Sequence, residues 1–215
     1  MQLVNLTRSG LIDYTENQIN HFFPDGSTNL RSIIDVHLDE ALNRLHKCIN
    51  SVRCWKLDEF HYLHSSQYCT YLYFLSNTIW RNIGSKDVCT KLFLLNKALN
   101  GIDCFYEIEL PEMFFIGHSV GIVLSKATYS NYLVLYQNST VGKNHGIAPV
   151  LGVGVVMYPN TAIIGRCNVG AHTVLAQGTS LINTDSTGDS IVFNTSGSKI
   201  GSKPISRNVW EDIFR

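Results

Sequence analysis

Apolar residues recur at every sixth position in the second half of the chain. The series is Leu151, Met157, Ile163, Val169, Leu175 and Leu181. A small side chain follows four residues after five of them: Val155, Thr161, Cys167, Thr173 and Thr179. This period fits neither the 3.6 residues of a helical turn nor the alternation of a long strand. It is typical of a solenoid in which each short strand of a triangular coil turns one residue inward.

The same period begins earlier and is interrupted once. Its first part is Leu110, Ile116, Ile122 and, after one extra residue, Tyr129, Leu135 and Val141. We therefore expect the coil to start near Leu110 and to end near Thr184. The polar loop 142–148 should break it, because this loop falls out of the six-residue register. Beyond the coil, we expect a closing strand at 190–194 and a short docking helix at 209–214.

The first hundred residues carry helical periodicity instead. Residues 1–26 give mixed signals and end in a turn at Pro24-Asp25-Gly26. A helix capped by Ser27 or Thr28 is expected to run to about residue 52. A second, rich in aromatic residues, should span about 57–80, its aromatic stripe serving as core or oligomer interface. A third should cover 86–99 and end at Asn100-Gly101.

Together these elements predict an α+β fold with three parts. Residues 1–104 form an α-helical N-terminal domain, residues 105–194 a parallel β-helix, and residues 195–215 a C-terminal tail. With 45% hydrophobic residues the chain can bury a substantial core.

Composition excludes several function classes. Seventeen basic residues balance seventeen acidic ones, so no electrostatic footprint for nucleic acid is present. No apolar run approaches the roughly 18 residues of a membrane span, and the N-terminus lacks the apolar core of a signal peptide. The six cysteines show no CxxC spacing, which argues against a metal or redox site and for reduced thiols in a cytoplasmic protein.

Two of the eight histidines stand out by context. His118 lies in Phe115-Ile-Gly-His-Ser-Val-Gly-Ile-Val, and His145 lies in the loop that breaks the register. Binding and catalysis concentrate in such loops. The other histidines, including His172 at a corner of the coil, are interpreted as structural. Nucleotide-binding and zinc-protease motifs are absent from the sequence.

From about Phe60 to Val192 the chain resembles the serine acetyltransferases and the similar enzymes of bacterial surface-polysaccharide clusters. These are hexapeptide-repeat acyltransferases with a left-handed parallel β-helix. His118-Ser-Val-Gly-Ile-Val matches the family motif His-x-x-Gly-Ile-Val, and residues 149–181 align with the family repeats without a gap. The resemblance implies an acetyl-CoA-dependent O-acetyltransferase that needs no metal.

The resemblance also implies roles for individual residues. His118 would be the catalytic base, and His145 would match the second family histidine by region but not by register. Glu109, or secondarily Glu107, would orient His118. Two departures bear on the acceptor, because family residues that handle the charged groups of serine are replaced by Gly117 and Ile147. A sugar hydroxyl is therefore favoured over L-serine.

In the resembling family CoA lies in a groove between neighbouring coils. The corresponding positions here are Gly142, Lys143, Tyr158, Pro159, Gln177 and Gly178. Lys199 or Lys203 could meet the phosphates, although their interpretation as solvated tail lysines is favoured.

A triangular coil has three flat faces, and apolar residues are expected to point outward from this one. They are Val156, Ile164, Val174 and Ile182. Exposed apolar faces of this kind mark interfaces, so a homotrimer or a dimer of trimers is expected.

Three alternative functions stay open: serine O-acetyltransferase, amino-sugar N-acetyltransferase and non-catalytic β-helix scaffold.

Overall fold

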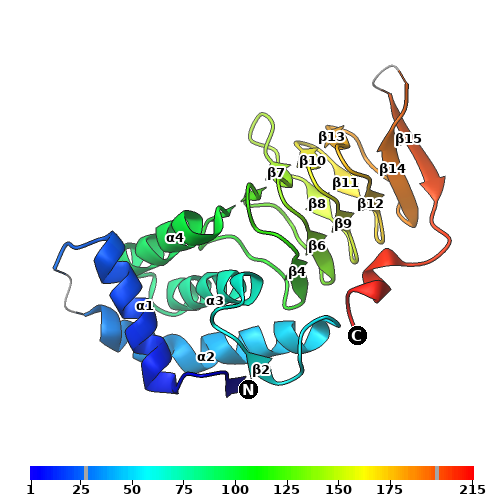
Figure 1. Cartoon of the computed structure of the whole chain (residues 1–215). Coiled ribbons are helices and arrows are strands. Elements are labelled where there is room, and N and C mark those ends of the chain that lie inside the picture. Colours follow the sequence, from blue (N-terminus) through cyan, green and yellow to red (C-terminus); the bar gives the residue numbers. More distant parts are fainter. Residues whose placement is uncertain (27–28, 197–198) are drawn as a thin grey trace.

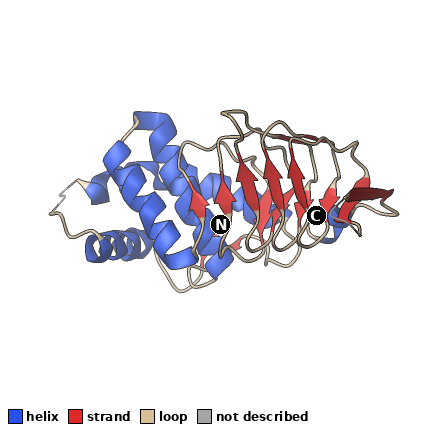
Figure 2. Cartoon of the chain, turned by 90° about the horizontal axis from the view of Figure 1, so that it is seen from above, coloured by secondary structure: helices blue, strands red, loops and turns tan. Residues whose placement is uncertain are grey.

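The chain forms an elongated molecule, with helices packed at one end and a stack of short strands extending from them (Figure 1; Figure 2). The structure is a computed structural model that describes residues 1–26, 29–196 and 199–215. Ser27 and Thr28, the expected helix caps, lie outside the described residues. Among the described residues, no helix combines the length and apolar composition that a membrane crossing requires.

Four helices build the N-terminal part. They are α1 (Arg8–Phe22), α2 (Leu30–Ser51), α3 (Ser65–Ile83) and α4 (Lys86–Asn100). Helix α1 was not predicted, because only a narrow stripe of its residues is apolar and buried. The prediction for α4 is confirmed, and Gly101 ends it in the left-handed conformation with its N–H bonded to the carbonyl of Lys97.

The start predicted for the aromatic helix α3 is wrong by eight residues. The preceding segment instead forms β2 (Glu59–Phe60), which pairs in parallel with β1 (Gln2–Leu3). The interpretation of the aromatic stripe as core is confirmed, since Tyr71 and Phe74 are buried.

The remaining strands form a β-helix with three sheets. Sheet 1 consists of β3 (Asp103–Cys104), β5 (Val123–Leu124), β7 (Thr140–Gly142), β10 (Ala162–Ile164) and β13 (Ser180–Ile182). Sheet 2 consists of β8 (Val150–Leu151) and β11 (Asn168–Val169). Sheet 3 consists of β4 (Phe114–Ile116), β6 (Leu133–Leu135), β9 (Val156–Met157), β12 (Val174–Leu175), β14 (Ser190–Asn194) and β15 (Ile200–Pro204). All pairings are parallel except that of β14 with β15.

The six-residue series is confirmed as the inward track of this coil. Every member from Leu110 to Leu181 is buried, and so are the small residues that follow, such as Thr161 and Thr173. The coil starts one strand earlier than predicted, because β3 already pairs with β5. The tail contains β15, also unpredicted, and a short 3-10 helix at Val209–Asp212 within the expected docking segment.

Three lines of turns run along the prism. The His118 edge joins sheet 3 to sheet 1 and comprises residues 117–122, 136–139, 158–161 and 176–179. The His145 edge joins sheet 1 to sheet 2 and comprises residues 143–149, 165–167 and 183–185. The tail edge joins sheet 2 to sheet 3 and comprises residues 130–132, 152–155, 170–173 and 187–189.

Helix α3 ties the helical part to the first coil. The Tyr73 hydroxyl donates to the carbonyl of Ile108 at 2.8 Å and accepts from the N–H of Leu110 at 2.9 Å. The Asn77 amide donates to the carbonyl of Tyr106 at 2.8 Å. These bonds satisfy backbone groups that have no strand partner at the open end of the solenoid.

The C-terminal segment packs along the tail edge and returns to the helices. Trp210 stacks on Tyr132 and on His172. Arg215 donates to four carbonyls at the end of α2 and directly after it, among them those of Val52 and Trp55. The apolar outer side of the adjoining sheet 3 is accordingly covered within one chain.

The expectation that four apolar residues point into solvent is therefore only half right. Val156 and Val174, on sheet 3, are buried in the single chain. Ile182 is 54% exposed, and Ile164 beside it is partly exposed. Both belong to sheet 1, so sheet 1 keeps apolar surface exposed in the single chain.

The tight corners of the coil predict a position-specific effect of glycine substitution. A Cβ added at Gly170 would lie 2.4 Å from the backbone nitrogen of Gly188, whereas at Gly142 its nearest neighbour is a side-chain carbon of Ile164 at 3.4 Å. Gly170→Ala should lower the free energy of unfolding by about 1–3 kcal/mol, since the next coil must move. The matched control Gly142→Ala should cost less than about 0.5 kcal/mol. Denaturant unfolding measures both, and equal losses would contradict this packing.

Candidate active site

His118 projects from the first turn of the His118 edge, directly after β4. Two hydrogen bonds hold this turn against the end of α4. Ser119 Oγ donates to the carbonyl of Asn100 at 2.6 Å, and the backbone N–H of Gly121 donates to the carbonyl of Gly101 at 2.9 Å. The His118 side chain is exposed, and it makes no hydrogen bond within the described part of the chain. Its ring is thus free to accept a proton from a bound molecule.

A pocket of about 360 Å³ opens beside His118, between the helical part and the coil. The segments around α3 contribute Cys54, Trp55, His64, Ser65 and Ser66, and the coil contributes Phe115, Gly117, His118 and Tyr136. Ser66 Oγ donates to the carbonyl of Gly117 at 3.1 Å, which fixes the floor. The lining contains no aspartate, glutamate, lysine or arginine.

Aromatic rings connect this pocket to the His118 edge. The Trp55 and Phe115 ring centroids are 5.5 Å apart, and those of Phe115 and Tyr136 are 6.4 Å apart. Tyr136 stacks on Tyr158 of the next coil, with centroids 5.5 Å apart and planes 9° apart. Burial raises the pKa of the Tyr136 hydroxyl, so this ring stays neutral at physiological pH.

Gly117 is required by this stacking. A Cβ at this position would lie 2.6 Å from a ring carbon of Tyr136. The resembling family carries an acidic residue at the position of Gly117. Its side chain would overlap the Tyr136 ring in the orientation that the ring has in this chain.

His145 lies on a different edge of the prism. The inserted loop is a small hairpin, in which Asn144 and Ile147 exchange backbone hydrogen bonds of 2.9 and 3.0 Å. His145 and Gly146 form its tip with φ of +48° and +79°, as a type I′ turn requires. Because sheet 1 separates the His145 edge from the His118 edge, one chain does not bring His118 and His145 together.

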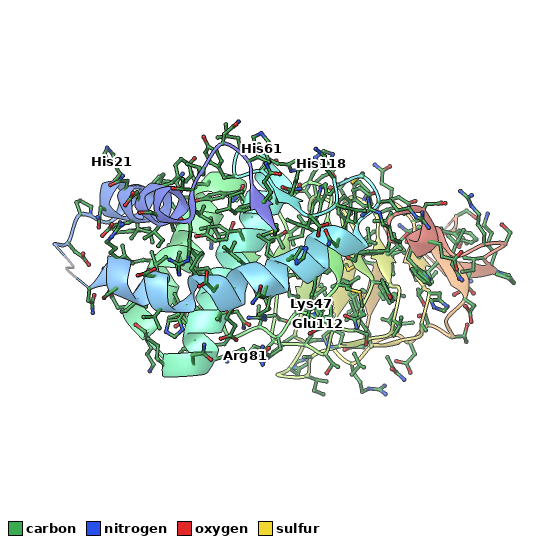
Figure 3. The ribbon with its side chains drawn as sticks, turned by 90° about the horizontal axis from the view of Figure 1, so that it is seen from below. His21, Lys47, His61, Arg81, Glu112 and His118 are labelled. Atoms are coloured by element: carbon green, nitrogen blue, oxygen red, sulfur yellow. The ribbon has the colours of Figure 1, made fainter. Side chains whose placement is uncertain are left out.

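The two candidate carboxylates lie away from His118 as well. Glu107 forms an ion pair with Lys126. Glu109 is exposed, and its charge acts on Arg44 of α2. Among the described residues neither carboxylate hydrogen-bonds His118. Figure 3 likewise places Glu112, three residues after Glu109, well apart from His118.

The candidate CoA residues fall on two edges. Tyr158, Pro159, Gln177 and Gly178 follow one another along the His118 edge. Lys199 lies close to this group. The backbone N–H of Thr195 donates to the carbonyl of Lys199, and the side-chain amide of the neighbouring Asn194 donates to the carbonyl of Gly178. Gly142 and Lys143 lie instead beside the hairpin of His145.

One wall of the pocket comes from the helical part, and the sequence did not predict it. Trp55 and His64 precede α3 in the sequence; Trp55 packs against Phe115 of the first coil, and His64 packs against Trp55. No local motif marks such a contact. The aromatic density of residues 60–80 was the available signal, and it was interpreted as core and oligomer interface alone.

Solved serine acetyltransferases resemble this chain over most of its length. The enzyme from Neisseria gonorrhoeae has a TM-score of 0.71 at 16% identity, over 94% of this chain and 79% of that one. Isoform 3 from Entamoeba histolytica, in complex with cysteine, has a TM-score of 0.64 at 17% identity, over 95% and 76%. A serine acetyltransferase in complex with CoA has a TM-score of 0.66 at 16% identity, over 80% and 75%.

These likenesses establish the fold, N-terminal helices followed by a left-handed β-helix, as the sequence predicted. No protein-family model and no curated protein matches the chain in sequence. The chemistry of the site must accordingly be argued from its own residues.

The contact of Gly117 with Tyr136 predicts a coupled pair of substitutions. Gly117→Ala should lower the free energy of unfolding by about 1–3 kcal/mol, because its methyl group displaces the Tyr136 ring. In a Tyr136→Ala background the same substitution should cost much less, because the ring is gone. A double-mutant cycle from denaturant unfolding measures the coupling, and additive effects would show that the ring does not constrain position 117.

Proposed function

We propose that this protein is an acetyl-CoA-dependent O-acetyltransferase, in which His118 activates a hydroxyl of the acceptor. The observation that carries the proposal is His118 itself. Its imidazole is exposed and makes no hydrogen bond to any described residue, beside a pocket whose lining holds no Asp, Glu, Lys or Arg, on an edge of a fold shared with serine acetyltransferases. A structural histidine at a coil corner would instead be hydrogen-bonded, as His172 is to Asp189 at 2.8 Å.

The proposed reaction is direct transfer. His118 removes the proton from the acceptor hydroxyl, and the oxygen attacks the thioester carbonyl of acetyl-CoA. The tetrahedral intermediate collapses with cleavage of the carbon–sulfur bond, and the proton passes from His118 to the CoA thiolate. Backbone N–H groups or His145 would stabilise the oxyanion.

The role expected for Glu109 finds no support in the single chain. A carboxylate that orients a catalytic histidine must be within hydrogen-bond distance of its ring. Glu109 faces the α2 side of the junction and Glu107 is paired with Lys126. We therefore propose His118 as the base, with no carboxylate of its own chain to orient the imidazole.

The proposed acceptor is a neutral hydroxyl compound, with a sugar favoured. Free serine carries an ammonium and a carboxylate, and their burial needs charged partners, which the part of the pocket formed by one chain lacks. Aromatic walls such as Trp55 and Tyr136 suit the apolar face of a sugar ring. Serine is the second candidate, because the structural neighbours are serine acetyltransferases.

The proposed CoA site follows the His118 edge. Tyr158, Pro159, Gln177 and Gly178 continue this edge from the pocket, and Lys199 near its far end could meet phosphate groups. A neighbour of the same fold is in complex with CoA, which supports CoA as the carrier of the acyl group.

We further propose that the active site is completed by a second chain of a homotrimer. His118 and His145 flank sheet 1 on opposite edges, and sheet 1 exposes Val123 at 44% and Ile182 at 54%. Packing this face against a neighbouring prism buries the apolar residues. With cyclic symmetry, the His145 hairpin of one chain then meets the His118 edge of the next. Contacts between helical domains could join two such trimers.

Loss of the base should abolish transfer. We expect His118→Ala to lower the rate of thiol release from acetyl-CoA by roughly 10²–10⁴-fold, in the presence of methyl glycosides or serine as acceptors. The control His172→Ala removes a histidine remote from the pocket and should keep the wild-type rate. Unfolding of the His118 variant should match the wild type, since the side chain has no partner. A His118→Ala enzyme that keeps more than about a tenth of its turnover would overturn the assignment.

A shared site predicts complementation between inactive chains. His118→Ala and His145→Ala homotrimers should both be nearly inactive, whereas trimers assembled from an equal mixture should regain about a quarter of wild-type activity. Half of the chains supply an intact His118, and half of their neighbours supply an intact His145. The measurement is thiol release after joint refolding, with mass determined by light scattering. No recovery in mixed trimers of confirmed composition would contradict a site shared between neighbouring chains.

A further inference from the structure

A second histidine faces the pocket of His118 from the helical part. His64 is the N-cap residue of α3, and its Nδ1 accepts the backbone N–H of Gln67 at 3.5 Å. The carbonyl oxygen of the Gln67 side chain accepts the N–H of His61 at 2.8 Å, which fixes the approach to the helix. His61 and His118 lie on the same side of the molecule (Figure 3).

The cap contact at Nδ1 favours one tautomer of His64. An Nδ1 that accepts a hydrogen bond carries no proton, so in the neutral ring the proton is on Nε2. Desolvation on its packed side lowers the pKa of the His64 imidazole, which favours the neutral form at physiological pH. Among the described residues no hydrogen bond joins Nε2 to another residue, so its N–H is available to a bound molecule.

Packing holds this ring in place. Trp55 meets His64 edge to face, with centroids 5.9 Å apart and planes 80° apart, and Trp55 in turn packs on Phe115. Arg215 holds the backbone of this wall by donating to the carbonyl of Trp55 at 2.8 Å. The donor and the aromatic walls therefore form a preorganised surface on the helical side of the pocket.

We infer that this surface is the acceptor subsite, in which the His64 Nε2–H donates to an oxygen of a neutral, ring-shaped polyhydroxyl compound beside His118. This inference rests on the proposed function, because the bound compound is an acceptor only if the protein transfers an acetyl group to it. It assigns His64 a positioning role: His118 takes the proton, and His64 holds the ring that carries the reacting hydroxyl.

The alternatives for His64 explain less. A mere helix cap does not require a histidine, because serine, threonine, asparagine and aspartate cap more strongly. A metal site is not supported, since no group of three His, Cys, Asp or Glu side chains in the described ranges is arranged to hold an ion. A charged substrate group is disfavoured, because a neutral donor gives it no counter-charge.

Two substitutions separate the cap from the donor. His64→Asn keeps a side-chain acceptor for the N-cap but is too short to reach the pocket as Nε2 does. His64→Gln places an amide N–H₂ near the position of Nε2. Thermal unfolding of the Asn variant should therefore stay close to the wild type, and any change in binding reports the donor.

The decisive experiment measures binding without turnover. Methyl glucoside, methyl galactoside and methyl mannoside are titrated into the full chain, and histidine ¹⁵N resonances are followed by NMR. We expect the free protein to show His64 as the Nε2–H tautomer, and at least one glycoside to shift its resonances. His64→Asn should weaken that binding about tenfold, equal to about 1.4 kcal/mol, and His64→Gln should restore much of it.

The outcomes distinguish this inference from the proposed function. Glycoside binding that His64→Asn leaves unchanged, an Nδ1–H tautomer, or no binding by any of the three glycosides would overturn the subsite. Binding that depends on His64 but is not accompanied by thiol release from acetyl-CoA would uphold the subsite and overturn the acetyltransferase. Steady-state kinetics add one check: His64→Asn should raise the acceptor KM and leave that for acetyl-CoA unchanged.

Discussion

The hydrogen bonds between α3 and the backbone of the first coil are the constraint on which the rest of the structure depends. A solenoid ends in unpaired strand groups, and an exposed end invites association with other chains. Here Tyr73 and Asn77 satisfy the backbone groups of Tyr106, Ile108 and Leu110 from a helix. The helical part is thereby the cap of the β-helix, and neither part can be displaced without exposing the other.

The proposed site is a consequence of this capping. Ser66 of α3 and the end of α4 hold the turn that carries His118, through the carbonyl of Gly117 and the contacts of Ser119. The same docking brings Trp55 and His64 to the pocket. The repeats supply a rigid edge and the helices supply one wall, so the coil alone would have no acceptor pocket of this form.

Much of the fold could be predicted from the sequence, because a six-residue period has few structural solutions. The inward track, the inserted loop and helix α4 all follow from local pattern and turn chemistry. Features that depend on distant contacts could not be predicted in this way. The burial of Val156 and Val174 and the pocket wall at Trp55 and His64 each result from segments that meet only in the folded chain. For the same reason, the motif around His118 marks a residue that lines the pocket, whereas Glu109 is not among the residues that line it.

Identification of the acetylated product tests the central claim most directly. The full-length protein is incubated with acetyl-CoA and an equimolar mixture of L-serine and neutral methyl glycosides, and the products are separated and identified by mass spectrometry. The uncharged, aromatic lining of the pocket predicts an O-acetylated glycoside as the main product, formed with one CoA thiol per ester. O-acetylserine as the main product, or no acetylated product at all, would contradict it.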